Sequence, residues 1–211
     1  MIAFHNFRKR FKGNTEDVLN IPDVLLDNEV YWLKGKNGVG KTSLIKSIAG
    51  IIPFEGQVSV DGVNINKNRM LYRLSVNYAE AEPLYPGFLT GTDLIDLYAY
   101  TKKATANQVN SLIKRFEVLA YKNNKLGSYS SGMIKKLSLL LAFIGQPTLI
   151  LLDEPFITLD PHALTIAEEL IAEYHSNGTG FIIASHQDFS VRNSIQPVSI
   201  ALINKTIFSA T

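Results

Sequence analysis

A glycine-rich segment near the start of the chain restricts the fold more than any other feature of the sequence. Gly35–Gly40 contains three glycines, follows the apolar run Val30–Leu33, and precedes a helical pattern that ends at Gly50. Glycine adopts positive φ without steric cost, so this segment allows a tight turn from a buried strand into a helix. Strand–turn–helix units are the repeating element of α/β folds, and the sequence therefore predicts an α/β protein.

Two further apolar runs support this fold class. Leu149–Leu152 and Phe181–Ala184 are continuously apolar, and each is followed by polar residues. Such runs are typical of parallel strands that are buried on both faces and whose carboxyl ends open into a site. Helical patterns at Met133–Ile144 and Ala163–Tyr174 alternate with them.

Other segments are expected to lie outside this parallel core. The dipeptide Asp61-Gly62 separates two short alternating runs, and Asn204-Lys205 follows a third, as in antiparallel hairpins. Residues from about Thr92 to Leu126 show helical patterns and no strand pattern. We therefore expect an antiparallel β subdomain and an inserted helical subdomain beside the core.

The composition excludes several kinds of site. The 211 residues include no cysteine, which rules out disulfides, thiolate zinc sites and iron–sulfur ligation by this chain. A formal net charge of +2 gives no reason to expect nucleic acid as a partner. Each half of the most apolar stretch, Leu137–Leu152, is too short for the roughly 20 residues that span a bilayer.

Gly35–Ser43 has the pattern G-x-x-x-x-G-K-[ST] of a phosphate-binding loop. Its glycines let backbone N–H groups converge on phosphate oxygens, and the following helix adds its N-terminal partial positive charge. Lys41 would bridge the β- and γ-phosphates of a nucleotide, and the Thr42 hydroxyl would bind Mg²⁺. The candidate phosphate-binding residues are Gly35, Asn37, Gly38, Gly40, Lys41, Thr42 and Ser43.

Two adjacent carboxylates, Asp153 and Glu154, follow the apolar run Leu149–Leu152. Alone, they could be solvated acids at a strand end. Next to a phosphate-binding loop, Asp153 becomes a candidate Mg²⁺ ligand. Glu154 is then placed to act as a general base toward an attacking water molecule.

Over essentially its whole length, the chain resembles the ATP-binding cassette (ABC) ATPases. Tyr129–Met133 is similar to the Leu-Ser-Gly-Gly-Gln signature of that family, in the form Tyr-Ser-x-Gly-Met. The resemblance implies that Ser130, Ser131 and Gly132 bind the γ-phosphate of ATP held by an opposite subunit, although Ser131 replaces the first glycine. Taken alone, the segment could be a serine-capped amphipathic helix.

Two further segments resemble motifs of the family. Thr158–Pro161 resembles the loop that links the two nucleotide sites of a dimer, which implies a role for Asp160; it is also an ordinary Asp-Pro helix start. His186 follows the run Phe181–Ala184, where the family places a histidine against the γ-phosphate. Histidine can donate to developing negative charge, so His186 is a candidate catalytic residue.

The resemblance suggests an adenine site, but the chain lacks one residue that is typical of the family. Phe11 lies near where the family stacks an aromatic ring on adenine, but the segment Phe7–Lys12 could instead be a basic nucleic-acid patch or a solvated strand edge. The family has a glutamine after the strand expected here at Leu74–Tyr78, and this chain has none there. Glu80, Glu82 or water would then complete the metal shell.

The resemblance implies one ABC ATPase domain over residues 1–211, with an α/β P-loop NTPase (RecA-like) core. Residues 1–80 and 145–211 would form this core with its antiparallel β subdomain, and residues 82–140 the helical subdomain that includes the signature. ATP and Mg²⁺ would be the cofactors.

It also implies a function and partners. The chain would pair with a second ABC ATPase subunit, as a homo- or heterodimer, and power a separate membrane permease from the cytoplasmic face of the membrane. The small size and the variant signature look most like bacterial exporter cassettes. The alternative is a soluble ABC ATPase of the cofactor-assembly type. A DNA-repair member is disfavoured because the sequence shows neither heptads nor cysteines.

Overall fold

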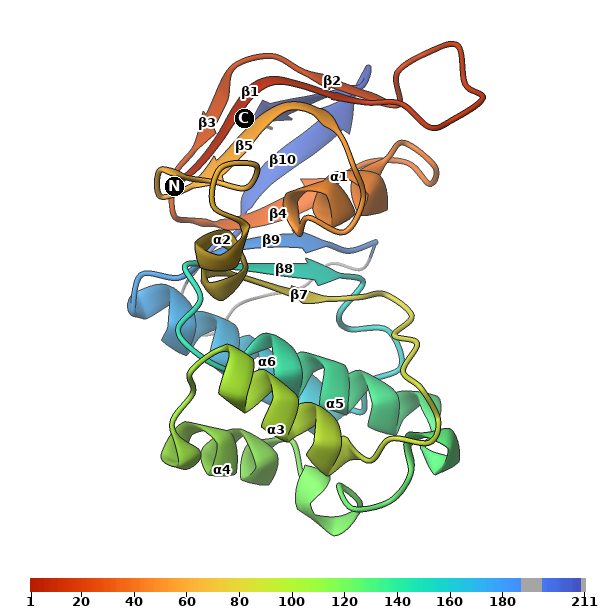
Figure 1. The fold of residues 1–211 in the computed structure, drawn as a ribbon, viewed down its shortest axis with the longest axis vertical. Coiled ribbons are helices and arrows are strands. Elements are labelled where there is room, and N and C mark those ends of the chain that lie inside the picture. Colours follow the sequence, from red (N-terminus) through yellow and green to blue (C-terminus); the bar gives the residue numbers. More distant parts are fainter. Residues whose placement is uncertain (187–194, 210–211) are drawn as a thin grey trace.

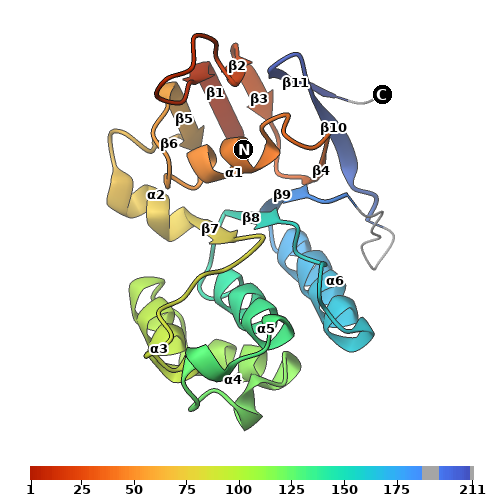
Figure 2. The same ribbon diagram turned by 90° about the vertical axis from the view of Figure 1, so that its right-hand side faces the viewer.

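The computed structural model describes residues 1–186 and 195–209, and in these ranges the strands form two sheets (Figures 1 and 2). The larger sheet contains, in spatial order, β11 (Thr206–Ser209), β10 (Val198–Ile203), β4 (Val30–Lys34), β9 (Gly180–Ala184), β8 (Leu149–Asp153) and β7 (Val76–Ala79). The smaller sheet contains β2 (Leu19–Ile21), β1 (Ile2–Lys9), β5 (Glu55–Val60) and β6 (Val63–Asn64), and β3 (Val24–Leu26) also pairs with β1.

The larger sheet is parallel from β10 to β7, and its centre is fully buried. Every residue of β8 and β9 is buried. These strands, and β4 beside them, contain the three continuously apolar runs of the sequence, so the prediction of buried parallel strands is confirmed.

Alternate residues of β8 face opposite layers, because successive side chains of a strand point to opposite faces. Leu149 and Leu151 pack with the small sheet and with α1 (Lys41–Ile48), which lies between the two sheets. Ile150 and Leu152 pack on the other face with α5 (Ser131–Ala142) and α6 (Pro161–Ser176). The sheet is therefore covered on both faces by apolar layers.

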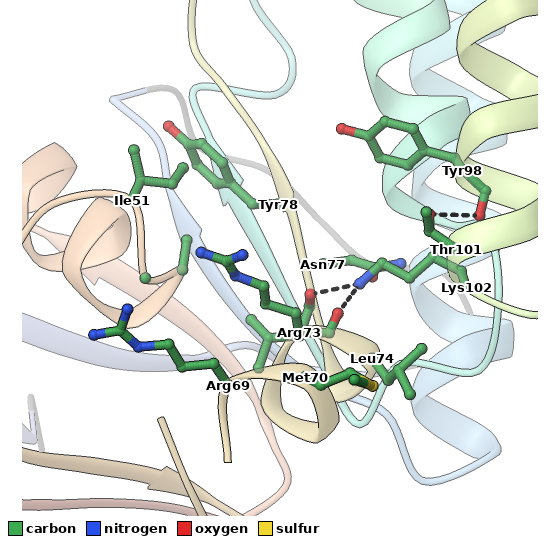
Figure 3. A pocket seen from close by; sticks show the side chains of 13 residues that line it. Ile51, Arg69, Met70, Arg73, Leu74, Asn77, Tyr78, Tyr98, Thr101 and Lys102 are labelled. Atoms are coloured by element: carbon green, nitrogen blue, oxygen red, sulfur yellow. Dashed lines mark hydrogen bonds between the residues drawn. The ribbon is translucent and has the colours of Figure 1, made fainter. Parts of the chain in front are cut away.

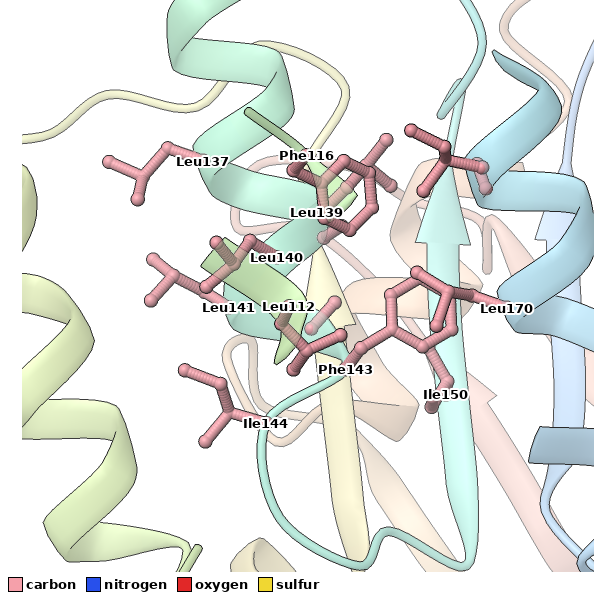
Figure 4. Close-up of a cluster of buried hydrophobic side chains, with 14 of the residues drawn as sticks. Leu112, Phe116, Leu137, Leu139, Leu140, Leu141, Phe143, Ile144, Ile150 and Leu170 are labelled. Atoms are coloured by element: carbon pink, nitrogen blue, oxygen red, sulfur yellow. The ribbon is translucent and has the colours of Figure 1, made fainter. Parts of the chain in front are cut away.

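Helices follow one another between β7 and β8. They are α3 (Gly91–Thr101), α4 (Ala106–Arg115), the short 3₁₀ turns η1 (Val118–Ala120) and η2 (Leu126–Ser128), and α5. The Thr90 hydroxyl accepts a hydrogen bond from the Asp93 N–H at 3.1 Å and so caps α3. Figure 4 shows how Phe116, Leu140 and Phe143 fill the space between these helices and the sheet. The predicted helical region is confirmed.

Both predicted turns are confirmed. Asp61 and Gly62 have φ of 45° and 76° and join β5 to β6, which pair as an antiparallel hairpin. Two positive φ values in a two-residue loop match the right-handed twist of the paired strands. Asn204 and Lys205 join β10 to β11 in the same way, with φ of 46° and 71°. The expectation that the run before this turn lies outside the parallel core is wrong, because β10 pairs in parallel with β4 in the larger sheet. Its alternating pattern reflects one exposed face near the edge of that sheet.

The strand expected at Leu74–Tyr78 is wrong in its first half. Helix α2 (Arg69–Ser75) occupies this part, and β7 begins only at Val76. The Tyr72 side chain is buried, and its hydroxyl donates to the Ile48 carbonyl at 2.7 Å, which fixes α2 against the end of α1. This tertiary contact is distant in sequence, and it overrides the local strand pattern.

None of the helices in the described ranges has both the length and the apolar character needed to cross a membrane.

Candidate active site

The glycine-rich segment forms the connection between β4 and α1, at the carboxyl edge of the larger sheet. Gly38 and Gly40 have φ of 76° and 109°, and Gly40 directly precedes the first helical residue, Lys41. A Cβ atom at Gly40 would lie 3.0 Å from the Leu19 side chain, so both space and conformation favour glycine here. No side chain among residues 1–186 and 195–209 caps α1, which leaves its first N–H groups available to an anion.

The Lys41 ammonium is held against its own loop. Its side chain is buried, and Nζ donates to the Gly35 carbonyl at 2.8 Å and to the Lys36 carbonyl at 3.3 Å. Burial lowers the pKa of Lys41, and the charges of Glu154 and Asp153 act against this shift. The cation is thus kept beside the two acids without a direct ion pair to either in the described ranges.

A cavity of about 450 Å³ brings most of the candidate residues together. It is lined by Phe11, Val18, Asn37, Gly38, Gly40, Lys41, Thr42, Ser43, Asp153, Glu154, Ile157 and His186. Ten of these are candidates from the sequence. Val18 and Ile157 were not predicted, because single apolar residues in loops belong to no periodic pattern.

Asp153 carries a buried carboxylate oxygen that nothing in the described ranges satisfies. The residue is 1% exposed at the end of β8, the Thr42 hydroxyl donates to its carboxylate, and its Oδ2 atom has no hydrogen-bond partner there. Burial raises the pKa of Asp153, and the hydrogen bond from Thr42 opposes that rise. A hydroxyl and a free carboxylate oxygen suit Mg²⁺, which is typically held by one or two protein oxygens together with phosphate and water.

Glu154 and His186 form a pair across the ends of β8 and β9. His186 Nε2 lies 3.2 Å from Glu154 Oε1, and the His186 backbone N–H donates to Oε2 at 3.3 Å. Glu154 has a φ of 44°, and its N–H donates to the Ala184 carbonyl at 2.8 Å. Positive φ at a non-glycine residue is held only where surrounding contacts require it, and here they aim a carboxylate into the cavity.

The single tryptophan of the sequence, Trp32, lies near the Glu154–His186 pair. Trp32 is on β4, and its indole N–H donates to the carbonyl of Ser185 at 3.0 Å. The Lys34 ammonium lies 3.8 Å from the centre of the Trp32 ring. Trp32 therefore contacts the residue directly before His186.

Phe11 reaches the cavity from the loop after β1. Its side chain is 41% exposed, and the Lys9 ammonium lies 4.4 Å from the centre of its ring. A half-exposed aromatic face at the rim of the cavity is suited to stacking on a base. Adenine stacking by Phe11 remains a prediction.

Several candidates lie outside this cavity. The Ser130 hydroxyl caps α5 by accepting from the Met133 N–H at 3.3 Å, and Ser131 and Gly132 begin that helix. The Asp160 carboxylate caps α6 by accepting from the Ala163 N–H at 2.8 Å. Both capping roles are therefore present. Gly35 contributes its carbonyl to Lys41 but does not line the cavity.

The two capped helix starts adjoin each other. A Cβ atom at Gly132 would lie 3.4 Å from the Thr158 carbonyl, and Lys136 of α5 forms an ion pair of 2.6 Å with Asp160. The hydrogen bond from the Lys136 ammonium is the largest cause of a lowered pKa of Asp160. Ser130–Gly132 and Asp160 thus belong to one surface, separate from the cavity around Lys41.

Neither acid expected to replace the missing glutamine lines the cavity. The Glu80 carboxylate pairs with the Lys46 ammonium on α1, and Glu82 is exposed. The ammonium of Lys135 is bonded to the backbone at this point instead, at 3.1 Å from the Glu80 carbonyl and 3.0 Å from the Ala81 carbonyl.

A second hollow of about 870 Å³ lies between α2, β7 and α3 (Figure 3). We call it the α2–α3 groove; Arg69, Met70, Arg73 and Lys102 line it, with Ile51 from the loop after α1. The Lys102 ammonium donates to the carbonyls of Arg73 and Val76, the latter at 2.9 Å. The groove is thus basic and partly apolar.

Comparisons with known proteins identify the family. Residues 24–157 match the family model described as ABC transporter. The chain is 29% identical over 195 residues to the ABC transporter ATP-binding protein NatA of Bacillus subtilis (strain 168), covering 88% of this chain and 79% of that protein. It is also 29% identical over 197 residues to the cytochrome c biogenesis ATP-binding export protein CcmA of Histophilus somni (strain 129Pt), covering 87% of each.

Solved structures share the fold. One, described as an ATP-binding subunit of an ABC transporter, has a TM-score of 0.87 and 23% identity over 99% of this chain and 90% of that one. Another, a dimeric ATP-binding cassette in a post-hydrolysis state bound to ADP and Pi, has a TM-score of 0.82 and 18% identity over 98% of this chain and 96% of that one. The predicted P-loop NTPase fold is confirmed. The family model spans more than half of the chain, and the chain accordingly belongs to the ABC transporter family as an ATP-binding ATPase domain.

Proposed function

We propose that this chain hydrolyses MgATP in the cavity at the start of α1, as the ATPase subunit of a transporter whose permease is a separate membrane protein. The observation that carries the proposal is that one space of about 450 Å³ holds a buried lysine, a hydroxyl–carboxylate pair and a glutamate–histidine pair. These are the groups that phosphoryl transfer requires for binding charge, holding metal and activating water.

Binding of ATP begins with the loop between β4 and α1. Its N–H groups and the N-terminus of α1 receive the phosphates, and the Lys41 ammonium exchanges its contacts with the Gly35 and Lys36 carbonyls for phosphate oxygens. The Thr42 hydroxyl and the free Asp153 oxygen would hold Mg²⁺. Mg²⁺ held there would neutralise the negative charge that develops on the phosphate oxygens.

Hydrolysis then uses Glu154 as the base. Water attacks the γ-phosphorus while the bond from that phosphorus to the bridging oxygen breaks, and ADP leaves with the bonding electrons. Glu154 accepts the proton that the water loses. His186 lies 3.2 Å from the Glu154 carboxylate and holds it in the cavity, and its Nε2 lies 3.4 Å from the Lys41 ammonium, so its ring would lie beside the γ-phosphate.

Ser130–Gly132 and Asp160 act on a second subunit in this proposal. They lie outside the cavity of their own chain, and Ser130 and Asp160 cap two adjoining helix starts. Helix N-termini attract phosphate, so this surface suits the γ-phosphate of ATP bound by a partner. ATP would then join two subunits, and its hydrolysis would release them.

The Glu154→Gln variant tests hydrolysis and dimer closure together. We expect phosphate release to fall about 100-fold or more, because the amide cannot accept the proton. ATP binding persists, so the variant should elute with MgATP as a dimer of twice 23.4 kDa. Wild-type turnover in Glu154→Gln would contradict the assigned base, and a monomer at saturating MgATP would contradict ATP-driven closure.

The α2–α3 groove is the surface that we assign to the permease. Met70 and Ile51 expose 79% and 56% of their surface there, beside the cationic Arg69, Arg73 and Lys102. This combination fits a cytoplasmic helix of the permease that presents apolar and acidic side chains. Such docking would place the chain on the cytoplasmic face of the membrane.

Charge reversal tests this assignment. Arg69→Glu with Arg73→Glu should remove the chain from purified membranes that contain the permease, while Arg8→Glu on the exposed surface of β1 should not. Basal ATP hydrolysis should persist in both. Equal membrane binding of the two variants overturns the docking site. Absence of any membrane-spanning partner from the purified wild-type complex favours a soluble cofactor-assembly ATPase instead.

A further inference from the structure

Lys135 is a buried lysine. It lies on α5 with 2% of its surface exposed, next to Lys136, whose ammonium reaches the surface and pairs with Asp160. Burial lowers the pKa of Lys135 to about 8. Lysine is rarely buried unless its charge is matched by specific partners, so the contacts of this ammonium require an explanation.

The ammonium bonds to the ends of two neighbouring strands. Nζ donates to the carbonyls of Glu80 and Ala81, which directly follow β7, at 3.1 and 3.0 Å. It also donates to the Asp153 carbonyl, at the end of β8, at 3.5 Å. One side chain of α5 therefore connects both strand ends at the edge of the sheet that carries the acid pair.

The negative charges around Lys135 belong to the same edge. The carboxylates of Asp153, Glu154, Glu80 and Glu82 all act on it, with Asp153 the strongest of them. Lys135 thus lies behind the catalytic carboxylates, on the side away from the cavity, and does not line that cavity.

Glu80 extends the connection to the phosphate-binding loop. Its carbonyl accepts from Lys135, and its carboxylate pairs with Lys46 on α1. A continuous polar path therefore runs from α5, which starts after Ser130, through Lys135, Glu80 and Lys46 to α1, which starts at Lys41. It passes through the position at which the glutamine of the family is missing.

We propose that Lys135 is a positioning residue for ATP hydrolysis. Its ammonium donates to the backbone carbonyls of Glu80, Ala81 and Asp153, and so fixes the position of the Asp153–Glu154 pair relative to the helix that begins at Ser131. The assignment rests on the proposed roles of Asp153 and Glu154. Lys135 does not line the cavity proposed to hold the nucleotide and the metal. It acts through the backbone, because a displacement of about 1 Å at a catalytic group is enough to slow a reaction by up to 100-fold.

The Lys135→Met variant should separate turnover from binding. Methionine fills a similar volume but gives no hydrogen to the three carbonyls. We expect kcat to fall about tenfold or more, while the dissociation constant for MgATP stays within about twofold, because only the geometry of the reacting state is disturbed. Lys135→Arg, which keeps the charge and several donors, should recover most of the lost kcat.

Asn77→Leu is the matched control for loss of stability. The buried Asn77 side chain on β7 donates to the Ala142 and Ile144 carbonyls, at 2.7 and 2.8 Å, and so ties the same strand to the other end of α5. Its loss should lower Tm and leave kcat of the folded protein within about twofold.

The outcomes are distinct. The inference is overturned if kcat of Lys135→Met stays within about twofold of wild type, or if its MgATP affinity falls in parallel with kcat. Either result leaves the proposed function untouched. If Lys135→Met does not fold, Lys135→Leu replaces it; unchanged kcat in that shorter variant, which also has no side-chain donor, overturns the inference as well. Full turnover in Glu154→Gln, measured in the same assay, instead overturns the proposed hydrolytic role on which the inference rests.

Discussion

The contacts of Lys41 hold its ammonium in a position that suits phosphate binding. Two loop carbonyls hold its ammonium, and the acid pair attracts it, yet its side chain is buried and its pKa is lowered by that burial. A phosphate group would supply the negative charge that backbone carbonyls only partly provide. Lys41 therefore gains more from a bound nucleotide than an exposed lysine would.

Lys41→Ala should abolish measurable ATP binding. We expect the dissociation constant to rise at least about 100-fold, which corresponds to about 2.7 kcal/mol. Isothermal titration calorimetry measures this change, with Lys114→Ala on the exposed side of α4 as the control of equal charge loss. Unchanged affinity in Lys41→Ala would remove this residue from the site.

Phe11 provides a second test at the scale of single residues. If its ring stacks on adenine, Phe11→Ala should weaken ATP binding by about 1–3 kcal/mol, and Phe11→Trp should preserve it. Phe208→Ala, which truncates another half-exposed phenylalanine on β11, should have no effect. Equal affinities of Phe11→Ala and wild type would favour the solvated strand edge that the sequence also allowed.

At the scale of elements, the sequence predicted what local patterns determine. β8 and β9 are buried on both faces, so their apolar runs are continuous and were visible as such. Helix α2 was not predicted, because its place depends on the bond from Tyr72 to the Ile48 carbonyl. Lys135 was missed for a similar reason: it has the same sequence signal as its neighbour Lys136, and only the packing of α5 against β7 and β8 buries one of them.

Lys102, which joins α3 to α2 and β7, should make the free energy of unfolding depend on pH. Burial lowers the pKa of Lys102 to about 8, below the value of about 10.4 for an unfolded lysine. Between these values the unfolded chain binds more protons than the folded chain, so the free energy of unfolding should rise with pH. Above about pH 10 tyrosine ionisation in the unfolded chain acts in the opposite direction.

Lys102→Met should reduce this dependence. Urea unfolding between pH 7.5 and about 9.5 should give a smaller increase in the free energy of unfolding for the variant than for wild type. Identical slopes in the two proteins would show that the Lys102 ammonium is charged and well solvated throughout this range.

At the scale of the whole molecule, residues from distant parts of the chain meet at the carboxyl edge of one sheet. Asp153 ends β8, Lys41 and His186 follow β4 and β9, and the parallel order of these three strands makes their meeting predictable. Val18 and Ile157 were not predictable, because loops of the small sheet and of α6 carry them to the cavity. The surface formed by Ser130–Gly132 and Asp160 lies apart from the cavity around Lys41, as the proposed binding to a partner's ATP requires.

The bond from Trp32 to the Ser185 carbonyl supplies the molecule with its own optical probe. The chain has one tryptophan, and its indole is fixed one residue away from His186. If His186 shifts when phosphate enters, the surroundings of the indole change, and its emission should change with them.

MgATP should accordingly alter the fluorescence of the wild-type protein but not of Lys41→Ala. A signal that is equal in both would arise from something other than nucleotide binding. Because no dye or tag is required, the same emission could be followed through a complete turnover, and the time at which the catalytic edge of the sheet resets could be read directly from the unlabelled subunit.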